Sequence, residues 1–183
     1  MTAGLPDAHE VLSFWRDAGQ ARWYVKDDAF DAAIRDRFGS LWQQAAAGRL
    51  AEWERSDEGT LALLIVLDQF PRNMFRNDPR AFSSDPLARE VALRALEHNV
   101  DARIGGELRQ FLYLPFMHSE DLADQERCVA LFAPLGNENN TKYAIIHADI
   151  IRKFGRFPHR NSVLGRGTTA EEQAFLDSGG FSG

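Results

Sequence analysis

The chain has 183 residues, a formal net charge of −6 and one cysteine. A chain of this length can form one domain with its own core, and a single cysteine excludes an internal disulfide and fits a reducing compartment. The acidic balance argues against general nucleic-acid binding, which needs a broad basic face. The chain starts with polar residues rather than a signal peptide, and its longest apolar run, residues 61–67, is far shorter than the roughly 20 residues that cross a bilayer. We therefore expect a cytoplasmic protein that binds neither nucleic acid nor membranes.

Helical periodicity dominates the first half of the chain. A first helix is expected after Pro6 and Asp7, with Val11 and Trp15 facing inward and Gly19 ending it. A second helix, ending near residue 48, has apolar side chains that recur with helical spacing at Phe30, Ile34, Phe38, Leu41, Trp42 and Ala45. Residues 61–67 are apolar on every side, which predicts a central, buried helix.

The second half of the chain also indicates helices. A fourth helix opens at Asp85, and a short apolar segment follows at residues 108–117. Ser119 is expected to cap a helix that ends at residue 132. The longest late helix, 140–157, should be halted by Pro158.

The end of the chain completes an all-α prediction. Thr169 and Glu172 have the spacing of a capping box before a last short helix. Alternating strand patterns are nearly absent, so we expect antiparallel helical hairpins in a single domain over residues 1–177 and a flexible tail at 178–183. The four tryptophans should pack the N-terminal helices together.

Residues 150–170 form a basic block without Asp or Glu, which carries Arg152, Lys153, Arg156, Arg160 and Arg166. Pro158 and three glycines divide the block into loops, where binding groups tend to lie. Hydrogen bonds from arginine to a carboxylate or phosphate contribute about 1.5–3 kcal/mol each, so two or three could hold a small anion. The alternative is a solvated basic face that pairs with the acidic surface, and each exposed pair contributes only about 0–1 kcal/mol.

The peptide LDQFPRNMFR, residues 67–76, follows directly from the apolar run. Asp68 comes one turn after Leu64 and should be partly buried, which requires a partner for its charge. Arg72 is four residues further on, the spacing of a helical ion pair, although Pro71 disfavours helical geometry at the residue before it. This pair is either structural or part of a ligand or catalytic site that includes Gln69 and Asn73.

Histidines supply the other candidate groups. His118 and Asp121 fall at i and i+3 with Gln125 at i+7, so the imidazole could act as an acid or base beside a carboxylate. The alternative is local capping, because acids in a first helical turn are favoured by the helix dipole. His147 lies on an apolar stripe, where a histidine is more often a core residue than a ligand. No metal-ligand spacing joins His118, His147 and His159, and no phosphate-binding glycine motif is present, so we expect neither metal nor cofactor.

Five peptides resemble one known family. These are Phe14-Trp15, WYVKDDAFD (23–31), LDQFPRNMFR (67–76), FMHSED (116–121) and FGRFPHRNSVLGR (154–166). Together they resemble the bacterial family catalogued as domain of unknown function 924, over about residues 10 to 177. The resemblance implies an all-helical fold similar to the tetratricopeptide-like right-handed superhelix, and no defined reaction.

The leading hypothesis is a pocket for a small anionic ligand bearing a phosphate or carboxylate group. We expect three separate peptides to converge on it and to contribute Asp68, Gln69, Arg72, Asn73, His118, Asp121, Arg156, His159, Arg160 and Asn161. One alternative is an enzyme of unknown reaction that uses His118, His147 or Asp68 as a catalytic group and arginines to stabilise negative charge. The other is a peptide-binding helical scaffold, which rests on fold analogy alone.

Overall fold

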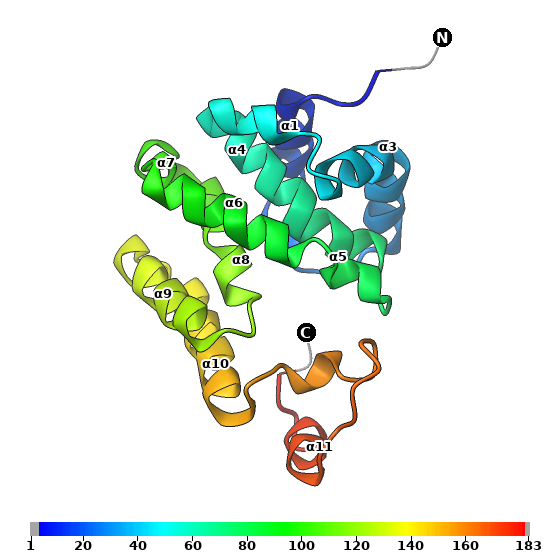
Figure 1. Ribbon diagram of the computed structural model, residues 1–183, viewed down its shortest axis with the longest axis vertical. Coiled ribbons are helices and arrows are strands. Elements are labelled where there is room, and N and C mark those ends of the chain that lie inside the picture. Colours follow the sequence, from blue (N-terminus) through cyan, green and yellow to red (C-terminus); the bar gives the residue numbers. More distant parts are fainter. Residues whose placement is uncertain (1–3, 182–183) are drawn as a thin grey trace. The chain divides into compact units, whose positions relative to one another are not determined.

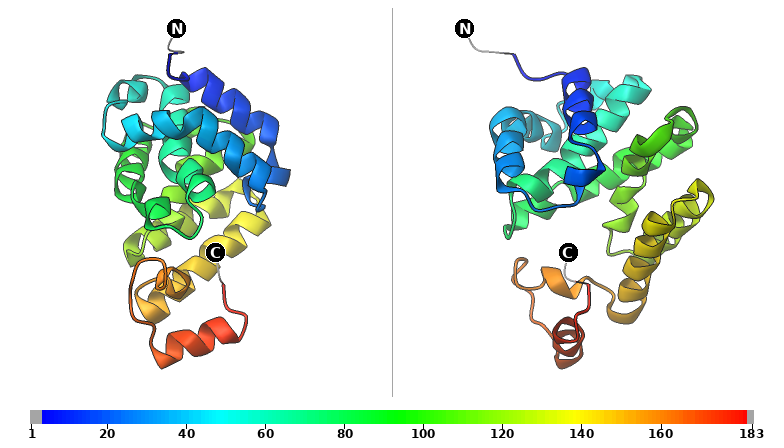
Figure 2. Two further views of the ribbon diagram at one scale, coloured as in Figure 1. Left: turned by 90° about the vertical axis from the view of Figure 1, so that its right-hand side faces the viewer. Right: turned by 180° about the vertical axis from the view of Figure 1, so that it is seen from behind.

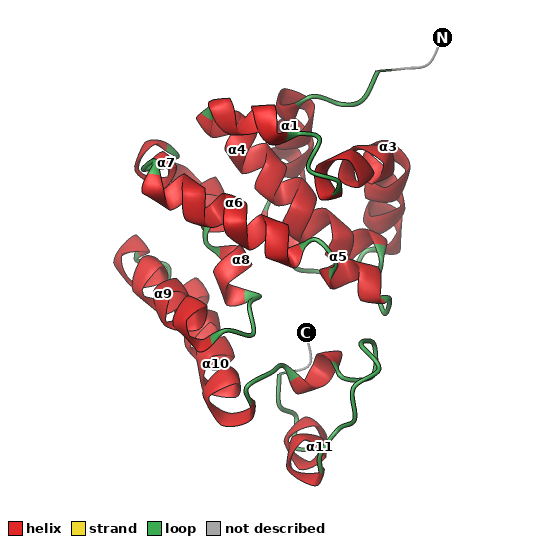
Figure 3. Ribbon diagram, viewed as in Figure 1, coloured by secondary structure: helices red, strands yellow, loops and turns green. Residues whose placement is uncertain are grey.

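The computed structural model describes residues 4–181, and these residues form helices and loops without a strand (Figures 1 and 3). The all-α prediction is therefore confirmed. The described residues divide into two compact units, the first formed by residues 4–76 and 80–115 and the second by residues 77–79 and 116–181. The single domain over residues 1–177 stays a prediction. Within the described residues, no helix is both long and apolar enough to span a membrane.

The first unit contains seven α-helices among its described residues, joined in part by 3₁₀ turns: α1 (Ala8–Ala18), α2 (Gln20–Trp23), α3 (Asp28–Ala46), α4 (Asp57–Leu64), α5 (Phe70–Met74), α6 (Asp85–Glu97) and α7 (Val100–Arg103). Helix α1 begins after Asp7, whose carboxylate accepts a hydrogen bond from the backbone of Glu10, and Gly19 ends it. The six apolar positions expected in α3 are all buried. The cap of α1 and the apolar spacing of α3 are local features, so both can be predicted from the sequence.

Helix α4 lies at the centre of the first unit. It packs against α1 and α6 (Figure 1), and every residue from 61 to 67 is buried, as predicted. Trp15 stacks on Trp23 and Phe30, with ring centroids 6.1 and 6.0 Å apart. Trp42 packs against Phe75 at 4.8 Å. These contacts confirm that Trp15, Trp23 and Trp42 pack the N-terminal helices.

A π-helical turn joins α4 to α5. Residues 65–69 form the turn, and the backbone N–H of Phe70 bonds to the carbonyl of Ile65. Phe70 keeps helical dihedrals (φ −57°, ψ −41°). Contrary to the expectation, Pro71 therefore does not disrupt the helical geometry of the residue before it. Since Pro71 has no N–H, it cannot bond to the carbonyl of Leu67. That oxygen accepts instead from Ser84 Oγ at 2.6 Å.

The second unit is built on a helical hairpin. Helices α9 (Leu122–Phe132) and α10 (Glu138–Phe154) pack side by side (Figure 2), and α11 (Ala170–Asp177) follows. Helix α8 (Leu114–Met117) precedes them in the sequence. The capping box of Thr169 and Glu172 at α11 is confirmed.

Two expected boundaries in this unit were wrong. Asp121, rather than Ser119, caps α9, because its carboxylate accepts from the backbone of Ala123. Helix α10 ends at Gly155, before Pro158 is reached, because Gly155 adopts a left-handed conformation (φ 68°) that ends a helix without steric cost.

The C-terminal residues pack on α10. Ile150, Ile151 and Phe157 form a small core that Phe154, Phe175 and Phe181 also contact. Residue 181 of the expected flexible tail is thus in contact with this core, and residues 182 and 183 lie outside the described residues.

Candidate functional site

In the first unit, peptide 67–76 forms a network of buried ion pairs. Asp68 is 1% exposed, and Arg72 Nη1 lies 3.3 Å from its carboxylate. Gln69 Nε2 donates to the same carboxylate at 2.5 Å. Arg72 also donates two hydrogen bonds to Asp85, at 2.8 and 2.9 Å. The predicted Asp68–Arg72 pair is confirmed, and it joins the end of the π-helical turn to the start of α6.

Asp31 is the second buried carboxylate of this network, and its role was not expected from the sequence. Asn73 Nδ2 donates to it at 2.8 Å, and Arg76 pairs with it as well. Asn73 is thus engaged in linking α5 to α3. The available signal was the position of Asp31, beside Phe30 and three residues before Ile34 on the apolar stripe of α3.

In the second unit, two of the three expected peptides meet. Glu120 accepts two hydrogen bonds from Arg166, at 2.7 and 3.0 Å, and one from the backbone of Phe157 at 2.8 Å. These bonds join peptide 116–121 to peptide 154–166. Peptide 67–76 belongs to the first unit, so convergence of all three stays a prediction. Glu120 was also missed, although it lies two residues from His118 and is the nearest acid to it in the sequence.

Arg156 and Asn161, expected to bind a ligand, both hold Glu172 of α11. Arg156 donates to both carboxylate oxygens of Glu172, at 2.6 and 2.8 Å, and to the carbonyl of Gly167. Asn161 donates to the same glutamate at 3.2 Å and accepts from Arg166 at 3.0 Å. The hydrogen bonds from Arg156, together with that from the backbone of Thr169, lower the pKa of Glu172 to about 2. This carboxylate therefore stays ionised and keeps the loop before α11 in place.

Most of the basic block is paired with acids from outside it. Arg152 lies 2.8 Å from Asp149, and Lys153 lies 3.4 Å from Glu171. Arg156 and Arg166 are also paired with acids, so four of the five basic side chains form ion pairs with acidic residues, as expected for a basic face that pairs with the acidic surface. Arg160 is the buried one of the five, with 7% of its surface exposed, and its guanidinium carbon lies 4.5 Å from the ring centroid of Phe157.

Arg160 belongs to a group that we call the histidine–arginine cluster, formed by His118, His147, His159 and Arg160. Burial, above all, lowers the pKa of His147 to about 3; the nearby His118, Arg160 and His159 act in the same direction, and the hydrogen bond to the Tyr143 carbonyl opposes them. Burial, followed by the charge of Arg160, lowers the pKa of His159 to about 4. Residues from three separate segments are therefore close enough to influence one another electrostatically.

The hydrogen bonds of the two buried histidines differ. His147 Nδ1 lies 2.8 Å from the carbonyl of Tyr143, and because a carbonyl only accepts, this nitrogen carries the proton. His159 Nδ1 is buried and has no hydrogen-bond partner among the described residues. Both imidazoles are neutral at pH 7, so the cluster combines one permanent cation with neutral groups that donate and accept hydrogen bonds.

Asp121 is the cap of α9, and its dyad with His118 stays a prediction. Its carboxylate caps α9 by accepting from Ala123 N at 2.8 Å, which is the capping alternative. Gln125 Nε2 donates to the carbonyls of Met117 and Ser119, at 2.7 and 2.6 Å. Since α9 starts after residue 121, His118 precedes the helix rather than sharing a face with Gln125, and Gln125 holds the backbone on both sides of it.

The surroundings of His147 and Asp68 can be compared with what a catalytic group requires. A general base works best with a pKa near the operating pH. A pKa of about 3 makes His147 a poor base at neutral pH. Asp68 is held by Arg72 and Gln69 as a structural carboxylate. Within the described part of the chain, no group of three or more His, Cys, Asp or Glu side chains could hold a metal ion.

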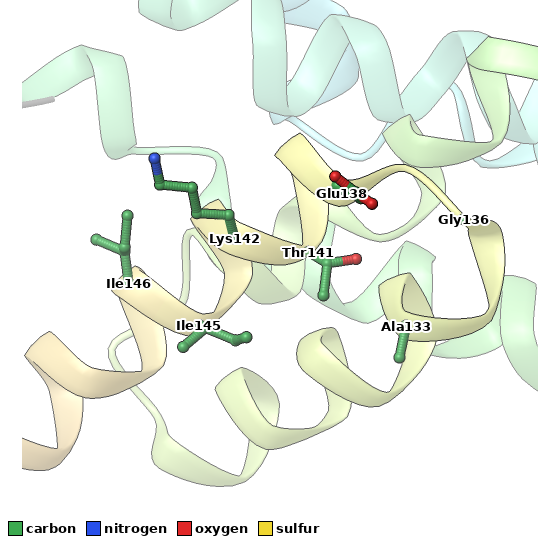
Figure 4. A pocket seen from close by; sticks show the side chains of 7 residues that line it. All are labelled: Ala133, Gly136, Glu138, Thr141, Lys142, Ile145 and Ile146. Carbon is green, nitrogen blue, oxygen red and sulfur yellow. The ribbon is translucent and has the colours of Figure 1, made fainter.

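An open hollow of about 460 Å³ lies on the α9–α10 hairpin (Figure 4). Its lining combines small, apolar and charged side chains, namely Ala133, Gly136, Glu138, Thr141, Lys142, Ile145 and Ile146. None of the residues expected to bind a ligand lines it. The hollow is therefore distinct from the histidine–arginine cluster.

Comparison with known proteins gives two matches. Residues 11–180 match the family model described as "Bacterial protein of unknown function (DUF924)". The structure is similar to that of a protein of unknown function from Agrobacterium tumefaciens, with 44% sequence identity and a TM-score of 0.91, covering 93% of this chain and 97% of the other. No curated protein matches the sequence. Neither description states an activity or a ligand.

Proposed function

We propose a function for this chain, which belongs to the DUF924 family of bacterial proteins of unknown function. Its histidine–arginine cluster binds a small anion with a phosphate or carboxylate group. The observation that carries the proposal is the buried guanidinium of Arg160 among histidines 118, 147 and 159. Arginine matches the geometry of carboxylates and phosphates and stays charged when buried.

His159 supports the same proposal. Buried polar atoms are normally hydrogen-bonded, and its Nδ1 atom is an exception among the described residues. An anion beside it would satisfy this nitrogen and would favour the protonated imidazole, because an opposite charge stabilises the charged form. The anion would therefore bind with proton uptake, and its affinity would increase as the pH falls from 7 towards 5.5.

The proposed site is smaller than the expected one. Arg72, Asn73, Arg156 and Asn161 each have partners within their own unit, so they position the chain rather than contact the ligand. A tetratricopeptide-like right-handed superhelix also remains a proposal, which the α9–α10 hairpin supports.

The test compares the response of the melting temperature to inorganic phosphate in three proteins. A ligand that binds the native state stabilises it by mass action. We expect millimolar phosphate to raise the melting temperature of the wild type and of Arg152→Gln, and to have much less effect on Arg160→Gln. Arg152 is the matched control because it is an exposed arginine of the same block.

The controls separate binding from general effects of the salt. Phosphate also stabilises proteins by exclusion from their surface, and this contribution is common to all three proteins. Circular dichroism checks that Arg160→Gln keeps its helices, and His159→Ala provides a second variant of the site with the arginine retained. An equal response to phosphate in all four proteins would exclude an anion site at this cluster.

A further inference from the structure

The ring of Phe181 lies on the histidines of the proposed site. Its centroid is 4.5 Å from that of His147 and 5.3 Å from that of His159, with interplanar angles of 59° and 79°. A third contact, to Tyr143, is 6.4 Å long. These distances and inclined geometries are those that aromatic rings prefer. Phe181 thus covers the aromatic side of the cluster.

Two glycines before Phe181 allow the backbone to turn so that its ring reaches the histidines. Gly179 has a φ of +81°, which side chains disfavour. Gly180 donates its N–H to the carbonyl of Phe175 at 3.0 Å, and a Cβ at this position would lie 2.6 Å from that residue. Two consecutive glycines therefore return the chain over α11 after the helix ends, and bring Phe181 to the histidines.

The chemistry of the covered surface indicates what could replace Phe181. Two neutral imidazoles and Phe157, whose ring lies 5.4 Å from that of His147, present aromatic surfaces. Arg160 adds a buried positive charge beside them. An aromatic ring with an attached anionic group would meet both the rings and the charge.

We propose that Phe181 occupies the place of an aromatic group of the ligand, and that the ligand is an aromatic anion that displaces Phe181 when it binds. This inference rests on the proposed anion site and adds the ligand class and a competing segment of the chain. Since the ligand binds only when Phe181 has left, its apparent affinity is the intrinsic affinity multiplied by the fraction of molecules in which Phe181 has left the site.

Calorimetric titration with phenyl phosphate and with inorganic phosphate tests the inference. We expect phenyl phosphate to bind Phe181→Ala at least about tenfold more tightly than the wild type, because the competing ring is gone. Inorganic phosphate, which has no ring, should bind both proteins with similar affinity. Phe175→Ala is the control, since it removes a ring of the same C-terminal segment that packs at an inclined angle against Phe154 rather than against a histidine.

The outcomes separate this inference from the proposed function. If both proteins bind inorganic phosphate and phenyl phosphate equally well, the aromatic ligand and the competition by Phe181 are wrong and the anion site stands. If neither protein binds either compound, the anion site is wrong and this inference falls with it.

A measurement without ligand tests the covering itself. Diethyl pyrocarbonate modifies accessible neutral imidazoles, and mass spectrometry locates the product. We expect His159 to react faster in Phe181→Ala than in the wild type and at an unchanged rate in Phe175→Ala. An equal rate in Phe181→Ala and the wild type would show that Phe181 does not protect the cluster.

Discussion

At the residue scale, Asp68 shows how the first unit holds a buried charge. Its carboxylate has Arg72 and Gln69 as neighbours, and Arg72 has a second acidic partner in Asp85. A buried ion whose partner is removed costs about 3–5 kcal/mol. In this network, however, Arg72 stays paired when Asp68 is lost, which reduces the penalty.

We therefore predict that Asp68→Ala lowers the free energy of unfolding by about 2–3 kcal/mol, below the cost of a fully stranded charge. Asp68→Asn keeps the shape and an acceptor oxygen, and should cost less than Asp68→Ala. Urea unfolding followed by circular dichroism measures both values, with the exposed Asp17→Ala as control. An unchanged stability in Asp68→Ala would contradict the buried, paired carboxylate.

At the scale of elements, the π-helical turn explains how Pro71 fits between α4 and α5. The turn shifts the backbone bonding, so that Phe70 bonds to Ile65, and the carbonyl of Leu67 is left for Ser84. Ser84 Oγ also accepts from Trp42 Nε1 at 3.1 Å. One hydroxyl thus satisfies two buried groups from two other elements.

Ser84→Ala should consequently destabilise the protein by about 1–3 kcal/mol, the cost of leaving buried polar groups unpaired. Ser83→Ala is a matched control, because its hydroxyl donates to the carbonyl of Arg80 at an exposed position. Thermal unfolding of both variants gives the comparison. Similar melting temperatures for Ser83→Ala and Ser84→Ala would show that the Leu67 carbonyl does not depend on Ser84.

At the scale of the whole molecule, the buried histidines make stability depend on pH. His147 has a pKa of about 3 in the native state and an ordinary value near 6.5 when unfolded. Below pH 6.5 the unfolded chain therefore binds more protons than the native one, and stability falls as the pH falls. Glu172, with a pKa of about 2, and Glu120, whose pKa Arg166 also lowers, add losses below about pH 4.5.

Between pH 7 and pH 5 we predict that His147 alone removes about 2 kcal/mol from the free energy of unfolding. His147→Gln should make this part of the profile less steep, with the remaining slope due to His159, whose pKa burial also lowers, whereas the exposed His98→Gln should leave the profile as in the wild type. Urea titrations at several pH values measure the slope. A wild-type stability that stays constant from pH 7 to pH 5 would contradict a neutral, buried His147.

The amino-acid sequence by itself determined the helical class, the caps of α1 and α11 and the pairing of Asp68 with Arg72. Caps such as Asp7 and the box of Thr169 with Glu172 act within four residues, and the apolar stripe of α3 reflects one helical period. Such signals are local, so they can be read without knowing the path of the chain.

Only the tertiary structure decided which arginine of the basic block is buried and which acidic side chains the others meet. Arg166 pairs with Glu120, which is 46 residues away, and Arg156 pairs with Glu172, which is 16 residues away. The burial of Arg160 beside Phe157 and the return of Phe181 to His147 also join distant segments. Ion pairing and burial depend on which segments the folded chain brings together, so identical side chains in one stretch of sequence acquire different roles.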